Sequence, residues 1–304
     1  MLTFNKKKET FLNDFKNLKE NINYYQNIKD EMGGASFYIS NENVEEIAVI
    51  YYGGLNEITE NHECYINIFI RDFNFKVMYI NEIINEILNY IMHKELMDWI
   101  YIQLFFENAK LYSEMLSLEY ILESKYHFSS INVKKEKLDL YKKQFDNNLR
   151  IRKATKADEN AILECIIKAY FNGTLKNQYK SIGKEKFKEN IKTYYYPFLN
   201  DSRISLVAEI DNEFCGHITY SVYPMGDKPT AFLIDVYIIE KFKELGVSSY
   251  LIKESEYICN KMGFERLCGN VSFAGDVHRT LKIYNSLISE NWVVDGLVLY
   301  LENN

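Results

Sequence analysis

The candidate catalytic and binding residues lie in the last third of the chain. Asp235 is the single acid inside an otherwise apolar stretch, residues 231–239, which has the composition of a buried strand. A carboxylate held in such a strand is a candidate to accept a proton from a substrate. The alternative is that Asp235 points outward or pairs with a nearby lysine. His217, on the preceding predicted strand, is a second candidate base, although such a histidine more often packs or forms hydrogen bonds.

A turn with the spacing Lys243-x-x-Gly246-x-Ser248 follows this strand, and a helical pattern follows the turn. The first turn of a helix leaves backbone N–H groups without intrahelical acceptors. The helix dipole adds about half a positive charge at the same end. A pyrophosphate suits this arrangement. The ordinary alternative is that Ser248 and Ser249 cap the helix while Lys243 is a solvated surface charge.

The same spacing resembles the Arg/Gln-x-x-Gly-x-Gly/Ala motif of the GNAT superfamily of N-acetyltransferases, with Lys243 and Ser248 as departures from it. The resemblance implies acetyl-CoA as co-substrate and no metal. The backbone at 245–249 would hold its pyrophosphate, and the strand backbone at 236–238 would pair with its pantetheine arm. Asn270 would orient a water or a cofactor amide, or else simply close a turn. The predicted cofactor-binding residues are Val236, Tyr237, Ile238, Lys243, Leu245, Gly246, Val247, Ser248, Ser249 and Asn270.

Tyr284 completes the predicted catalytic pair with Asp235. Ile283-Tyr284 resembles the Leu-Tyr of the family's Leu-Tyr-x-x-x-Gly-Phe segment, which implies that Tyr284 gives a proton to the departing CoA thiolate. A phenol suits this role because its ordinary pKa, about 10, is close to that of a thiol. The family's Gly-Phe is absent here, and Val277 stands where the family has Asn. Leu287 is the alternative occupant of the tyrosine position.

Composition and charge exclude several classes of protein. A net charge of −7 argues against a nucleic-acid partner, which would want a basic face. The sequence contains no run of 18 apolar residues, so it predicts no membrane span. The five cysteines are dispersed without a CxxC pair, as expected of reduced thiols in a cytoplasmic protein, and the scattered histidines and cysteines predict no metal site.

An internal repeat organises the chain, because the order strand, strand, helix, strand, helix, strand occurs twice. We predict an α+β fold of two tandem GNAT-like domains, each a mixed, mostly antiparallel twisted sheet flanked by helices. The predicted boundaries are residues 1–133 for a degenerate domain, 134–148 for a helical linker and 149–304 for the acetyltransferase domain. In the first half Tyr79 occupies the position of Gly246, and its ring would fill the space of a phosphate. We therefore expect that half to be structural or to shape the substrate site, without holding CoA.

These patterns predict an acyl-CoA-dependent N-acyltransferase. The acetyl group would pass from acetyl-CoA to a primary amine by direct attack, in the C-terminal domain. One alternative is a non-catalytic acyl-CoA-binding or regulatory protein on the same fold, and another is transfer of a longer acyl or aminoacyl group. The acceptor would be a small-molecule or peptide amine selected by residues 173–200. The sequence leaves a homodimer open.

Overall fold

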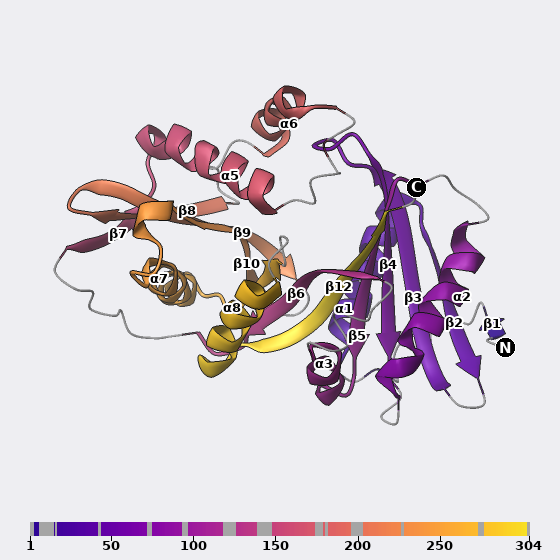
Figure 1. Ribbon diagram of the computed structural model, residues 1–304. Helices are drawn as coiled ribbons and strands as arrows, with labels where there is room; N and C mark the ends of the chain where they lie inside the picture. The colour runs from indigo at the N-terminus through magenta and orange to yellow at the C-terminus, as the bar shows by residue number, and fades with distance from the viewer. Residues whose placement is uncertain are drawn as a thin grey trace. The chain divides into compact units, whose positions relative to one another are not determined.

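The computed structural model divides the chain into two compact units, residues 1–132 with 294–304, and residues 133–293 (Figure 1). It describes residues 3–5, 15, 17–41, 44–71, 75–92, 97–117, 126–138, 148–173, 179, 182–195, 203–225, 228–272 and 277–302. Within these residues, no helix is long and apolar enough to cross a membrane.

The first unit is a mixed sheet with the strand order β1-β2-β3-β4-β5-β12-β6. The β4–β5 pair is parallel, whereas β1–β2, β2–β3, β3–β4 and β5–β12 are antiparallel. Its strands are β1 (Thr3–Asn5), β2 (Ala35–Asn41), β3 (Val44–Leu55), β4 (His62–Ile70), β5 (Trp99–Phe106), β6 (His127–Lys135) and β12 (Val293–Glu302). Its helices are α1 (Lys19–Met32), the 3₁₀ turn η2 (Val77–Tyr79), α2 (Ile80–Met92) and α3 (Lys110–Met115).

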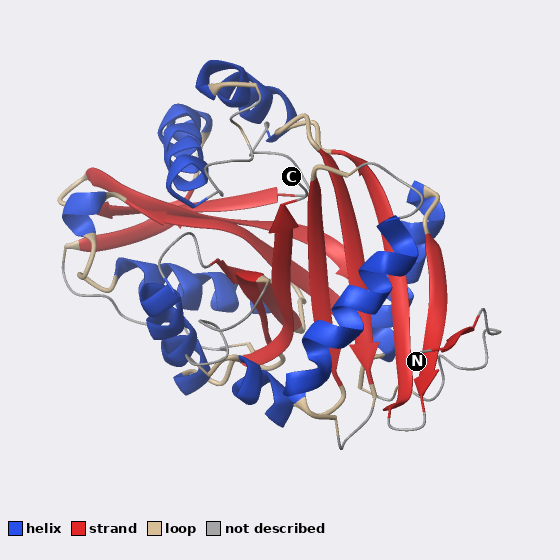
Figure 2. Cartoon of the chain, turned by 45° about the vertical axis from the view of Figure 1, so that its right-hand side comes forward, coloured by secondary structure: helices blue, strands red, loops and turns tan. Residues whose placement is uncertain are grey.

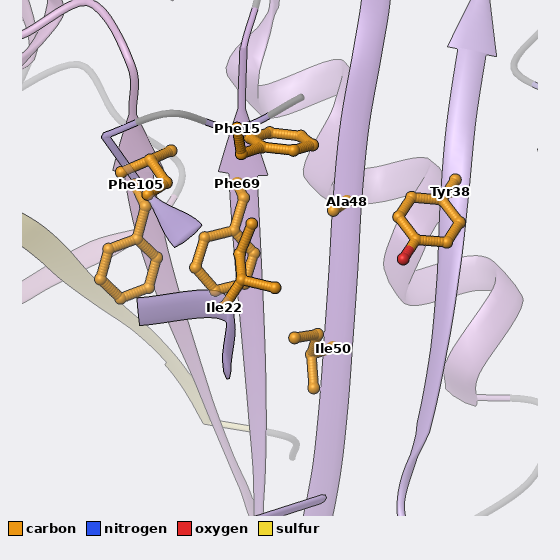
Figure 3. Packing of buried hydrophobic residues seen from close by; sticks show 8 residues of the cluster. Phe15, Ile22, Tyr38, Ala48, Ile50, Phe69 and Phe105 are labelled. Atoms are coloured by element: carbon orange, nitrogen blue, oxygen red, sulfur yellow. The ribbon is translucent and has the colours of Figure 1, made fainter. Parts of the chain in front are cut away.

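Helix α1 packs on one face of this sheet through an apolar and aromatic core. Ile22 of α1 lies over Phe69 of β4 and Phe105 of β5, whose rings stack 4.8 Å apart (Figure 3). The start of the helix is held by Glu107, whose carboxylate accepts a hydrogen bond from the Asn17 N–H at 2.9 Å. This bond anchors the chain just before Leu18, the N-cap residue of α1.

The second unit has the strand order β11-β10-β9-β8-β7, in which only β10 and β11 run parallel. Its strands are β7 (Leu149–Lys153), β8 (Arg203–Ile210), β9 (Glu213–Met225), β10 (Lys228–Ile238) and β11 (Arg266–Ser272). Its helices are η3 (Lys156–Asp158), α5 (Glu159–Gly173), α6 (Lys184–Asn190), η4 (Ile191–Tyr195), η5 (Glu240–Phe242), α7 (Val247–Lys261) and α8 (Val277–Ser289). Helices cover both faces of its sheet, as Figure 2 shows.

The chain leaves β7 and turns into helix at Thr155, the N-cap residue of η3. The Asp158 carboxylate accepts hydrogen bonds from the Thr155 N–H at 2.7 Å and from the Thr155 hydroxyl at 2.9 Å, a capping box. Arg152 of β7 donates to the same carboxylate and to Glu209 of β8. The Arg152 hydrogen bond, with those from Thr155, holds the pKa of Asp158 well below its usual range. This network fixes α5 against the edge of the sheet.

The predicted α+β class with mixed sheets and flanking helices is confirmed. The predicted boundaries place the last strand, β12, in the second domain, but the structure places it in the first unit. Leu297–Glu302 of β12 pair with Leu104–Trp99 of β5, so the C-terminal strand completes the sheet of the first unit. Most of the predicted linker, residues 139–147, lies outside the described part of the chain.

Candidate active site

Strands β10 and β11 separate soon after they begin. Thr230–Phe232 pair with Arg266–Cys268, and no later pair joins the two strands in the part of the chain that the structure describes. Strand β10 continues to pair with β9 as far as Ile238. Each residue from 232 to 238 is partly exposed. Past Phe232, the edge of β10 that faced β11 is therefore open to an extended ligand that pairs with backbone.

A bulge and a glycine shape this open segment. The register between β10 and β9 shifts between Leu233 and Asp235, which bends β10 where it leaves β11. Opposite the end of β10, a Cβ on Gly216 would lie 2.4 Å from the Tyr237 carbonyl oxygen. Only glycine allows this close approach of the two backbones.

The turn before α7 has left-handed backbone at two positions, Glu244 (φ 71°) and Gly246 (φ 75°). Gly246 is the N-cap of α7, and its carbonyl accepts from the Tyr250 N–H at 3.2 Å. Within the described residues, the amides of residues 247–249 have no such acceptor. The serine-cap alternative is wrong, because Ser248 and Ser249 lie inside the helix and no side chain caps it. The turn therefore presents backbone donors at the positive end of a 15-residue helix.

Two other predicted residues of the turn are on the surface. Leu245 is 57% exposed. Lys243 pairs with Glu240, whose side chain is 82% exposed. Such an exposed pair contributes little to stability, so Lys243 can exchange Glu240 for a stronger anion.

Asp235 lies on the face of the sheet that α5 covers. Burial, and next the charge on Asp235, raise the pKa of the Cys165 thiol of α5 to about 12. The Asp235 side chain is 17% exposed, and its Oδ2 lies 3.4 Å from Nε2 of His217. His217 is fully buried. Of the two candidate bases, only Asp235 therefore reaches the surface.

The other predicted residues lie on β11 and the helix after it. Asn270 is exposed on β11, and α8, which carries Tyr284, packs against this strand. Burial raises the pKa of the half-buried Tyr284 phenol. The structure thus places the two predicted catalytic side chains on separate elements that both adjoin β11, Asp235 on β10 and Tyr284 on α8.

Sequence reasoning missed Ser205 and Thr219, two fully buried hydroxyl residues beside His217. In the sequence, each could be recognised only as a polar residue at an inward-facing position of an apolar strand. This pattern is weak evidence for a functional role, because such residues also occur in strands that have no such role. Among the residues that the structure describes, no group of His, Cys, Asp and Glu could hold a metal ion.

Comparison with known proteins supports the fold. The Acetyltransferase (GNAT) family model matches residues 168–278. A GCN5-related N-acetyltransferase from Sphaerobacter thermophilus has a TM-score of 0.50 at 10% identity, over 99% of this chain and 95% of that chain. A tandem GNAT protein from the clavulanic acid biosynthesis pathway has a TM-score of 0.47 at 10% identity, over 99% of this chain and 98% of that chain. No curated protein matches the sequence.

The matched segment contains the bulged strand β10, the left-handed turn and helix α7, but it ends before Tyr284. The family model therefore includes both the partly exposed segment of β10 and the turn that precedes α7. Residues 168–278 thus match the GNAT family of acetyltransferases, and the fold of the chain is similar to that of a solved GCN5-related N-acetyltransferase.

Proposed function

We propose that this chain is an acyl-CoA-dependent N-acyltransferase that moves an acetyl group from acetyl-CoA to a primary amine, and that the second unit catalyses the transfer. The observation that carries the proposal is the open edge of β10 leading into the left-handed turn at Gly246. A strand edge that lacks a partner can pair with an amide-bearing arm, and free amides at a helix N-terminus can bind its pyrophosphate.

The chain's own residues supply the binding contacts. The backbone of β10 past Phe232, where β11 no longer pairs with it, offers the strand edge, and the amides of residues 247–249 offer the anion site. Lys243 adds a cation beside that site. Acetyl-CoA supplies an activated thioester carbonyl, which the amine attacks as the carbon–sulfur bond breaks.

Two side chains are assigned to the protons. Asp235 takes the proton that the attacking amine loses, because it is the acid exposed next to the open edge. Tyr284 gives a proton to the departing thiolate, because a phenol is protonated at neutral pH and its ordinary pKa, about 10, is close to that of a thiol. Burial raises the pKa of Cys165 and Cys259 to about 12 and that of Cys215 to about 11, so these thiols are poor nucleophiles. Direct attack by the amine, without an acyl-enzyme, fits these assignments.

Thiol release with a panel of amines tests the proposal. Purified protein is mixed with acetyl-CoA and each amine, and free CoA is followed with a thiol reagent. The background from the protein is low, because all five cysteines are buried. Amine-dependent release supports the proposal. Tight CoA binding with no release from any amine would instead support the non-catalytic acyl-CoA-binding alternative, and absence of CoA binding would exclude both.

A further inference from the structure

A row of polar side chains runs across the sheet of the second unit and ends at Asp235. Ser205 of β8 faces Thr219 of β9, and Thr219 faces Asp235 of β10, in the strand register. His217 precedes Thr219 by two residues and therefore lies on the same face. Ser205, Thr219 and His217 are fully buried, so Asp235 is the end of the row that meets solvent.

The distances join Ser205, Thr219 and His217 and bring His217 close to Asp235. Ser205 Oγ lies 2.7 Å from Thr219 Oγ1, and Thr219 Oγ1 lies 3.3 Å from His217 Nδ1. His217 Nε2 and Asp235 Oδ2 are 3.4 Å apart, which is long for a hydrogen bond. Both atoms are buried and have no hydrogen-bond partner elsewhere in the described part of the chain. Leaving both unsatisfied is costly, so a small side-chain rotation that joins them is favoured.

The chemistry of the groups orients the whole row. An ionised carboxylate can only accept a hydrogen bond, so His217 must donate from Nε2. A neutral imidazole then has an acceptor at Nδ1, and Thr219 must donate its hydroxyl proton there. Thr219 in turn accepts from the Ser205 hydroxyl, since its own proton is used. With a neutral imidazole, a single arrangement of protons satisfies every group, and bonds in such a line strengthen one another.

We propose that His217 is a positioning residue for Asp235, and that Thr219 and Ser205 hold it in the Nε2–H tautomer. The role in catalysis rests on the proposed function of Asp235, whereas the tautomer does not. By binding the buried Oδ2, His217 fixes the carboxylate rotamer. The exposed part of the Asp235 side chain is then held ready for the proton of the acceptor amine.

The first test needs no activity. Long-range ¹H–¹⁵N spectra of protein labelled in its five histidines report the tautomer of each ring. The signals lost in His217→Gln identify His217. We expect the Nε2–H tautomer in the unaltered protein, a mixed or changed tautomer in Thr219→Val, and a shifted Nε2 signal in Asp235→Asn. An Nδ1–H tautomer, or an Nε2 signal that ignores Asp235→Asn, would overturn the proposal.

The second test separates positioning from simple packing. We expect His217→Leu and Thr219→Val to lower kcat about fivefold or more while the Kd for CoA stays within twofold. His217→Gln, which retains a donor, should recover part of the loss. Ser221→Ala is the matched control, because Ser221 is a buried serine on the same strand and face but outside the row.

Wild-type kcat in both His217→Leu and Thr219→Val contradicts the positioning role. A wild-type protein that transfers no acetyl group, yet has the expected tautomer, would remove the proposed function and the catalytic role of His217 while the hydrogen-bonded row stands.

Discussion

The two parallel strand pairs of this chain differ in how far they stay together. In the first unit, β4 and β5 pair at eight consecutive positions, from Glu63–Trp99 to Ile70–Phe106. In the second unit, β10 and β11 pair at three positions. The β3–β4 register runs without a shift, whereas β9–β10 carries a bulge. Accordingly the end of β4 is buried and that of β10 is partly exposed. An extended ligand therefore finds an open strand edge in the second unit, while β4 is paired on both sides.

The turns after these strands differ in the same direction. The Tyr79 N–H donates to the Lys76 carbonyl at 3.0 Å, and the η2 turn runs directly into α2. Residues 75–80 contain no left-handed position, unlike Glu244 and Gly246. The Tyr79 side chain is also 42% exposed. The exposed ring leaves space for a phosphate. The Tyr79 amide, however, already donates to Lys76 and is not available to bind one.

The side chains that could do chemistry differ as well. Asn67 stands three residues before the end of β4, as Asp235 stands three before the end of β10. Asn67 is fully buried, and its amide donates to the Ile50 carbonyl at 3.2 Å. Ala48 occupies the place of His217, since it faces Phe69 as His217 faces Tyr237. At these two positions the first unit thus has neither the acid nor the histidine.

The largest effect is expected from Asp235→Asn. Loss of a general base costs about 10²- to 10⁴-fold in kcat, and the Kd for CoA should stay unchanged because the carboxamide has the same shape. Steady-state kinetics and calorimetry measure the two quantities. The first-unit counterpart, Asn67→Asp, should lower the thermal unfolding midpoint by burying a charge, without changing kcat of the folded protein. Equal losses of kcat in the two variants would contradict the comparison.

Gly246→Asp should weaken CoA binding by about 30- to 150-fold. A carboxylate at the turn repels the pyrophosphate and competes for its donors, a cost of about 2–3 kcal/mol. Calorimetry measures the Kd.

Gly246→Asn has the same shape without the charge and should bind CoA more tightly than the aspartate variant. Gly263→Asp is the second control, because Gly263 (φ 87°) is left-handed at the other end of α7, and a Cβ added there would meet nothing within 4 Å. Similar weakening by Gly263→Asp would show that backbone strain, and not the anion site, is responsible.

Tyr284→Phe should slow turnover about tenfold or more by removing the general acid. Tyr112 lies on α3, which follows β5 as α8 follows β11. It is buried, and its hydroxyl accepts from the Phe106 N–H at 3.0 Å. Tyr112→Phe should therefore cost about 1 kcal/mol of unfolding free energy and leave turnover unchanged. Rate measurements with chemical denaturation distinguish the pair. An unaltered rate in Tyr284→Phe would remove that residue from the mechanism.

The smallest effect is expected from Tyr79→Gly. We expect one CoA bound per chain both before and after this change, because β5 occupies the edge of β4 from Glu63 to Ile70. Calorimetric stoichiometry is the measurement. A second equivalent bound by Tyr79→Gly would show that the tyrosine ring, and not strand pairing, closes the first unit. Two equivalents in the unaltered protein would contradict the comparison altogether.

Much of the second unit could be predicted because its signals are local. The glycine turn, the helix after it and the capping box at Thr155 each depend on residues within a few positions of one another. The apolar run around Asp235 indicates a strand for the same reason. The roles assigned to Asp235, Tyr284 and the cofactor-binding residues stay predictions until the experiments above are done.

Local patterns in the sequence were enough to predict two repeats of one α+β order, a candidate anion turn at Gly246 and an acid in the strand before it. Where β10 leaves β11, that β12 completes the first sheet, and that His217 lies behind Asp235 became visible only in the folded chain. Strand pairing joins residues far apart in the chain. Period-two patterns specify which face of a strand is buried, but not which strand lies beside it or for how many residues.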